Sequence, residues 1–124
     1  MGYLRFEATE DSPEVLLDVD LSIFQIAGNS TPEDVNLIYN PIEDWLDNEG
    51  KNLDHCQCKL FFKYLSSSSH HKVFNVLQKL DDLFAEGRKL SVEWAYENID
   101  VDMLRLGLDF ASILEIPFEF SPRN

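Results

Sequence analysis

Two long stretches of the chain alternate between apolar and polar residues, which is the spacing of β-strands with one solvated face. The first stretch covers residues 56–64 and the second covers residues 90–97. Strands that are buried on both faces of a sheet are apolar nearly throughout, and these two are not. Shorter segments with strand character cover residues 3–8, 15–19, 22–27 and 116–120. The pattern therefore predicts a sheet with one largely polar face.

The first of three helical segments follows the strand at residues 22–27. Thr31 is a capping residue type, Pro32 suits the first position of a helix, and two acidic residues follow them. Apolar residues then recur at helical spacing until Gly50, which ends the segment. We expect a helix that starts at Thr31 and stops at Gly50.

Two further helices are expected, one through residues 73–83 to Gly87 and one over residues 100–115. Strands and helices thus alternate through most of the chain, which requires crossover connections and parallel strand pairs. The length suits one domain, residues 1–124. The sequence predicts an α/β fold whose mixed sheet carries its helices mainly on one face.

The charge of the chain restricts its partners. It has 23 acidic and ten basic side chains, a net charge of −13. Contacts with nucleic acids or anionic membranes use Lys and Arg to neutralise phosphates, so this composition disfavours both. A charge of this size favours association with a protein that offers a basic surface. We expect a protein partner, with no nucleic acid and no membrane.

Three features indicate a soluble cytoplasmic protein. Residues 1–9 contain no apolar run of the length that a signal peptide needs. The most apolar stretch, residues 104–114, is interrupted by two charged residues and cannot span a bilayer. Cys56 and Cys58 are too close in one strand for an ordinary disulfide, which fits a reducing compartment.

A run of four serines separates the strand at residues 56–64 from the second helix: Ser66, Ser67, Ser68 and Ser69. One interpretation is structural, because serine often caps a helix and serves a free N–H group. The other is a phosphorylation switch, because a phosphate carries roughly −1.5 to −2 charges and is favoured at the positive end of a helix. His70, His71 and Lys72 follow and can steady such a phosphate. Both interpretations can hold for different serines.

Four motifs in order resemble the SiaC family of bacterial regulatory phosphoproteins. The similarity extends from about residue 23 to residue 120. The motifs lie at residues 31–46, 62–69, 94–107 and 116–119. The family's central motif usually reads Tyr, an aromatic residue or Leu, then Asn-Thr-Ser-Ser, and here it reads Tyr64-Leu65-Ser66-Ser67-Ser68-Ser69.

The resemblance implies a domain similar to the STAS domain of anti-anti-sigma factors, acting by partner switching and not as an enzyme. A protein kinase phosphorylates the central Thr or Ser of the family motif, and a PP2C-type phosphatase removes the phosphate. The unphosphorylated form binds and activates an effector such as a diguanylate cyclase. Carried over from Tyr64, the acceptor is Ser67, Ser66 stands at the usual Asn, and His71 stands at a common Lys.

Two enzymatic interpretations are weaker. His55, Cys56 and Cys58 suggest a metal site, but zinc needs about four ligands, and His70 and His71 lie past the far end of the strand. Both cysteines share a strand face with Leu60, Phe62 and Tyr64, which is typical of core residues. Ser67 with His70 or His71 resembles a nucleophile and its base, but no Gly-x-Ser-x-Gly elbow is present. We expect no metal, no cofactor and no catalytic residue.

The third helix has more apolar residues than one buried stripe needs. One line includes Met103 and Phe110, and a second line includes Leu104 and Leu108. Either the helix is buried over a wide face, or the second line is a surface for a protein partner or for a second copy of the chain. The sequence leaves these alternatives open.

Overall fold

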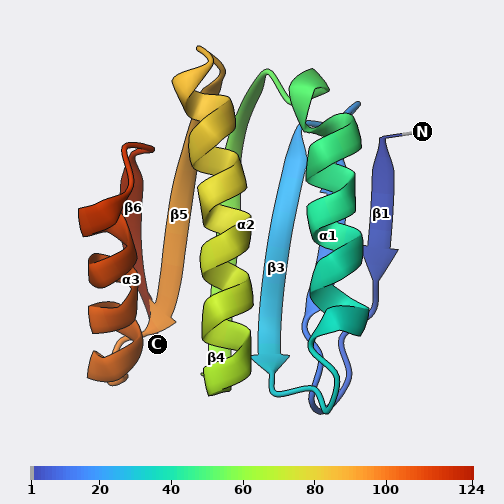
Figure 1. Ribbon diagram of the computed structural model, residues 1–124. Coiled ribbons are helices and arrows are strands. Elements are labelled where there is room, and N and C mark those ends of the chain that lie inside the picture. The colour runs from blue at the N-terminus through green and yellow to red at the C-terminus, as the bar shows by residue number, and fades with distance from the viewer. Residues whose placement is uncertain (1) are drawn as a thin grey trace.

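The computed structural model describes residues 2–124 and shows a mixed six-stranded sheet with three helices in front of one face (Figure 1). The strands are β1 (Tyr3–Phe6), β2 (Glu14–Asp18), β3 (Ile23–Ser30), β4 (His55–Leu65), β5 (Lys89–Glu97) and β6 (Phe118–Arg123). The helices are α1 (Asn36–Glu49), α2 (Ser67–Ala85) and α3 (Val101–Ile113), with a short 3-10 helix η1 (Gly50–Asn52). The predicted α/β fold, with its mixed sheet and one helical face, is confirmed.

The strands lie in the sheet in the order in which they occur in the chain. β1, β2 and β3 pair antiparallel, whereas β3, β4, β5 and β6 pair parallel. Each parallel pair is joined through one helix, so each helix begins after the carboxyl end of a strand. The first turns of α1, α2 and α3 therefore gather at one edge of the sheet, at the bottom of Figure 1.

The core fills the space between the sheet and the helices with large apolar side chains. The ring of Phe24 on β3 lies 6.2 Å from that of Trp45 on α1. Trp94 on β5 is fully buried, with ring centroids 6.0 Å from Phe62 on β4 and 5.7 Å from Phe110 on α3. Burying such a side chain stabilises a fold by about 1.5–3 kcal/mol. The apolar alternation in the sequence thus identifies the face of the sheet that the helices cover.

The predicted start of the first helix is wrong by several residues. α1 begins at Asn36 with Val35 in the capping position and no side-chain cap. The N–H of Thr31 instead donates to the carbonyl of Asp11 at 2.9 Å, which holds this residue against the loop between β1 and β2. Asp34 accepts the N–H of Asn36 at 3.0 Å. The predicted end is confirmed, because Gly50 is the C-terminal cap.

The prediction that Tyr64 shares the buried face of β4 is also wrong. Phe62 is buried, but Tyr64 is 68% exposed. The pairing with β3 shifts at this point, since Gly28 is opposite Phe62 while Asn29 is opposite Tyr64. One extra residue in β4 reverses the alternation that follows it, as a β-bulge does. The bulge lies directly before the serine run and sets how the chain enters α2.

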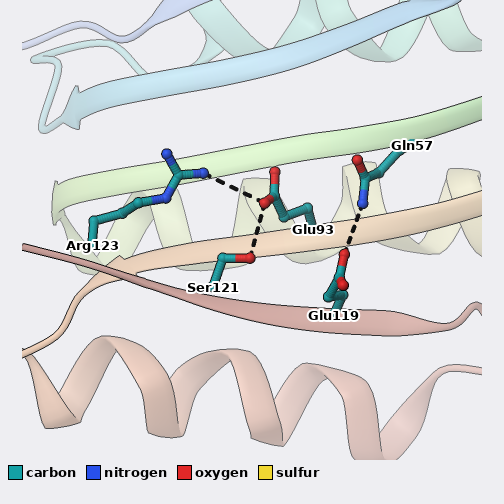
Figure 2. A network of polar contacts seen from close by, with 5 residues as sticks. All are labelled: Gln57, Glu93, Glu119, Ser121 and Arg123. Atoms are coloured by element: carbon teal, nitrogen blue, oxygen red, sulfur yellow. Dashed lines mark hydrogen bonds and ion pairs between the residues drawn. The ribbon is translucent and has the colours of Figure 1, made fainter.

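The face of the sheet without helices carries the polar side chains of the alternating strands. Figure 2 shows two groups of contacts there. Glu93 on β5 accepts hydrogen bonds from Ser121 at 2.9 Å and from Arg123 at 3.4 Å. Gln57 on β4 donates to Glu119 on β6 at 2.9 Å. The polar face predicted for these strands is confirmed.

This open face is electrically balanced, although the chain as a whole is not. Strand alternation directs ten charged side chains to it, five cationic and five anionic: Arg5, Lys59, Lys63, Lys89, Arg123, Glu14, Asp18, Glu93, Glu97 and Glu119. They sum to zero, so the net charge of −13 belongs to the rest of the chain, which has five basic and 18 acidic residues. The excess of negative charge therefore lies on the helices and loops.

Candidate functional site

The serine run forms the junction between β4 and α2. Ser66 is the N-terminal cap of α2, with φ −69° and ψ 160°, and its Oγ accepts the N–H of Ser69 at 3.3 Å. Its own N–H donates to the carbonyl of Ser30 at the end of β3, at 2.9 Å. Ser67 is the first residue of the helix. The capping interpretation is thus correct for Ser66, and the serine run starts the second helix as predicted.

The four hydroxyls of the run have different environments. Ser69 is fully buried and Ser66 is half-buried, whereas Ser67 and Ser68 are exposed. The hydroxyl of Ser68 forms a hydrogen bond with that of Ser66 at 3.2 Å. Within residues 2–124, the hydroxyl of Ser67 has no hydrogen-bond partner. Ser67 therefore combines exposure with a free hydroxyl, as an acceptor of a phosphoryl group must.

The surroundings of Ser67 are suited to a negative group. The first turn of α2 contains no acidic residue, and the positive end of a helix favours an anion by about 0.3–1 kcal/mol. His70 and His71 follow at the i+3 and i+4 positions, which places them next to Ser67 on the helix surface. The amine of Lys72 is directed to α1, where it donates to Asn40 at 3.5 Å.

Two buried residues that the sequence analysis missed lie beneath the serine run. Ser30 at the end of β3 and Tyr39 on α1 are both fully buried, and their oxygen atoms are 2.6 Å apart. The hydroxyl of Ser30 also donates to that of Ser69 at 3.0 Å. A signal was available for Tyr39, since its helical spacing predicts burial and a buried tyrosine hydroxyl needs a partner. Ser30 gave no signal, because only the folded chain brings it to Ser69.

Burial raises the pKa of Tyr39 from 10.0 to about 12, although hydrogen bonds with Ser30 and Ser69 act in the opposite direction. The folded protein therefore keeps this proton at pH values where the unfolded chain loses it. A raised folded-state pKa gives a stabilisation that is complete below the unfolded pKa and is lost as the pH rises through the folded pKa. The relevant window is thus pH 10 to about 12.

We expect the free energy of unfolding to fall more steeply in this window for the wild type than for a Tyr39→Phe variant, which has no phenol to titrate. The difference accumulates to about 2–3 kcal/mol at most, since each pKa unit corresponds to about 1.4 kcal/mol. Urea unfolding at several pH values across the window measures it for both proteins. Identical pH profiles would show that Tyr39 is not held in its protonated form by the fold.

The outer line of α3 forms an exposed apolar surface. Val101 is 58% exposed and Leu108 is 48% exposed, while Leu104 between them is half-buried. Met103 and Phe110 of the other line are buried in the core. Burial over a wide face therefore does not account for Leu108. This surface, which we call the α3 patch (Val101, Leu104 and Leu108), begins at the same edge of the sheet as the serine run (Figure 1).

The structure provides no observation that favours a metal site or a catalytic serine among residues 2–124. No group of three metal-ligating side chains occurs among residues 2–124. Cys56 and Cys58 are free and buried, and the thiol of Cys56 donates to the carbonyl of Ser22 at 3.1 Å. A hollow of about 210 Å³ lies on the open face of the sheet between Lys59, Phe61 and Glu93, away from the serines. No helix in the described part of the chain is long and apolar enough to cross a membrane.

The fold and the site together define a class of small mixed α/β proteins that offer a free, exposed hydroxyl at the start of a helix. The family model described as SiaC family regulatory phosphoprotein matches residues 6–123. The chain therefore belongs to the SiaC family.

Relatives in Pseudomonas aeruginosa agree with this assignment. An uncharacterised protein of strain UCBPP-PA14 is 23% identical over 121 residues, which is 95% of this chain and 94% of that protein. The crystal structure of apo-SiaC matches with a TM-score of 0.87 at 23% identity, covering 98% of this chain and 99% of that one. SiaC in complex with the diguanylate cyclase SiaD, which it activates, matches with a TM-score of 0.81 at 21% identity, covering 97% and 99% of the two chains. At these identities the structures show the shared fold.

Proposed function

We propose that the chain acts, as one domain over residues 1–124, as a phosphorylation-controlled binding protein in the cytoplasm. A protein kinase phosphorylates Ser67 and a PP2C-type phosphatase removes the phosphate. The unphosphorylated form binds and activates an effector such as a diguanylate cyclase, and the chain itself is not an enzyme. The observation that carries the proposal is the exposed, unbonded hydroxyl of Ser67 at the first position of α2.

A phosphate on Ser67 is compatible with the fold but not with a covering partner. It would lie at the positive end of α2, beside two histidines and with no acidic residue in the same helical turn. A partner that covers the serine run would have to remove water from this dianion. An unpaired charge buried in an interface costs several kcal/mol. Phosphorylation therefore leaves the domain folded and weakens the complex.

The effector class follows from the relative whose complex is known. SiaC of Pseudomonas aeruginosa is the activator of the diguanylate cyclase SiaD, and this chain has the same fold. The helices and loops together carry the whole excess of negative charge, which suits an effector with a basic surface. The α3 patch offers apolar area on that same side, and we assign it to the effector contact.

Mass spectrometry of the protein purified from its native cell tests the modification directly. We expect a singly phosphorylated peptide that covers the serine run, with the phosphate on Ser67. A Ser67→Ala variant should lose this signal, while a Ser68→Ala variant, which removes the other exposed hydroxyl, should keep it. An unchanged phosphopeptide in Ser67→Ala would contradict the assignment.

A Leu108→Arg variant is expected to bind the effector at least about tenfold more weakly, because it replaces exposed apolar area with a charge that the partner must desolvate. Its melting temperature should change little, since Leu108 is 48% exposed. Leu21→Arg is the matched control, because Leu21 is a 67% exposed leucine in the turn between β2 and β3, at the opposite edge of the sheet from the serine run. Titration calorimetry with the purified cyclase compares them, and equal affinities for both variants would remove the α3 patch from the interface.

A further inference from the structure

A chain of hydrogen-bonded hydroxyls links α1, β3 and α2 beneath Ser67. Tyr39 and Ser30 are 2.6 Å apart, Ser30 donates to Ser69 at 3.0 Å, and Ser66 donates to Ser69 at 2.9 Å. Three of these residues are fully buried and Ser66 is half-buried. The remainder of the core is apolar, since Ser30 and Ser69 are the only buried polar or charged residues within residues 2–124 apart from the tyrosine.

The direction of each hydrogen bond follows from counting protons. A serine hydroxyl has one proton to donate. Ser30 uses its proton toward Ser69, so the short contact with Tyr39 requires Tyr39 to be the donor. Ser66 likewise uses its proton toward Ser69, and its oxygen accepts the N–H of Ser69. The Ser69 oxygen thus accepts two hydrogen bonds, one from Ser66 and one from Ser30. Ser30 in turn accepts a hydrogen bond from Tyr39.

These hydrogen bonds hold the first turn of α2 on its buried side. Ser69 is held by β3 through Ser30 and by the cap residue Ser66, while the backbone of Ser66 is tied to Ser30 at 2.9 Å. Buried polar groups are costly without hydrogen-bond partners, and a network that supplies such partners favours one geometry of the elements it joins. With Ser69 turned inward, the helical geometry directs Ser67, two residues earlier, to a different side of α2.

We propose that Tyr39 and Ser30 are positioning residues for the switch, which hold the first turn of α2 so that Ser67 is the hydroxyl presented to the kinase. The inference rests on the proposed function of Ser67. Neither residue contacts Ser67 or the phosphate. They act through Ser69, which their hydrogen bonds keep buried and unavailable for modification.

Two variants interrupt the series of hydrogen-bonded hydroxyls with little change in side-chain shape: Tyr39→Phe and Ser30→Ala. Amide hydrogen exchange, followed by NMR, reports on the first turn at Ser69 and His70, whose N–H groups bond to Ser66. We expect exchange at these two amides to become about tenfold faster. A factor of about ten corresponds to the free energy that one lost buried hydrogen bond typically contributes. Exchange at Leu80, in the second half of α2, should change much less.

The second readout is the fraction of Ser67 that carries phosphate in the native cell, measured at equal protein level. Tyr39→Phe and Ser30→Ala should each lower it several-fold. Val15→Ala is the matched control, because it truncates a fully buried side chain on β2. It lowers global stability but leaves the hydrogen-bonded hydroxyls in place. This control should leave the phosphorylated fraction unchanged.

The outcomes separate the two levels of the proposal. Equal acceleration at Leu80 and at Ser69 overturns it, since the hydroxyls then act only on global stability. Unchanged Ser67 phosphorylation in both variants, despite faster exchange at Ser69, also overturns the positioning role. If wild-type protein never carries phosphate on Ser67, the proposed function itself fails. The exchange data still report whether the hydrogen-bonded hydroxyls hold the first turn of α2.

Discussion

A Ser67→Asp variant is expected to bind the effector much more weakly than Ser67→Ala while melting at nearly the same temperature. The two properties separate because they depend on different surroundings. In the free domain the new carboxylate lies at the positive end of α2, where it is tolerated or favoured by about 0.3–1 kcal/mol. In the complex the same charge must be desolvated, at a cost of several kcal/mol unless the partner supplies a cation.

Titration of both variants and the wild type against the purified cyclase, with thermal melts of each protein, measures this separation. Aspartate has less charge and fewer acceptor oxygens than a phosphate, so the loss of affinity should be smaller than with true phosphorylation. Equal binding of Ser67→Asp and Ser67→Ala would mean that the partner does not cover the start of α2.

A Gly107→Val variant is expected to lose about 3 kcal/mol of stability, close to the upper end for an overpacked core. α3 rests directly on the indole of Trp94, which donates from Nε1 to the carbonyl of Met103 at 3.0 Å. A Cβ at Gly107 would lie 2.5 Å from Cδ1 and from Nε1 of that ring. The ring cannot withdraw, because it is fully buried between Phe62 and Phe110.

The expected fall in melting temperature is roughly 10 °C for a domain of this size. Ala111→Val is the control, since it adds the same kind of bulk to a half-buried position of the same helix and should cost less than about 1 kcal/mol. Differential scanning calorimetry compares the three proteins. A Gly107→Val protein as stable as the control would show that α3 does not pack on Trp94 as closely as the distances indicate.

Local spacing was enough to predict most of the fold. Strand alternation identified β4 and β5 together with the face that the helices cover, because that periodicity is a property of the segment alone. The change from period two to helical period at Ser66 located the start of α2, which is where Ser67 lies. The acceptor position itself came from the resemblance to the SiaC family, and the exposure and free hydroxyl of Ser67 now support it.

The features that the sequence could not supply depend on contacts between distant residues. Thr31 has the properties of a cap, but its N–H bonds to Asp11, twenty positions earlier, and the helix starts later. Tyr64 follows the alternation of its strand until the pairing with β3 shifts. Ser30 is 39 residues from Ser69, its hydrogen-bond partner. None of these contacts leaves a periodic signal in its own segment.

In the proposed switch, phosphate on Ser67 controls binding of the effector, and a comparison that uses phosphate itself avoids the weaknesses of an aspartate substitution. The wild-type protein is phosphorylated to completion by its kinase, and its affinity for the purified cyclase is compared with that of the unmodified protein and of protein treated with a PP2C-type phosphatase. We expect phosphorylation to weaken binding by about a hundredfold to a thousandfold and phosphatase treatment to restore it. Equal affinity of the phosphorylated and unmodified proteins would show that Ser67 is not a switch for this complex.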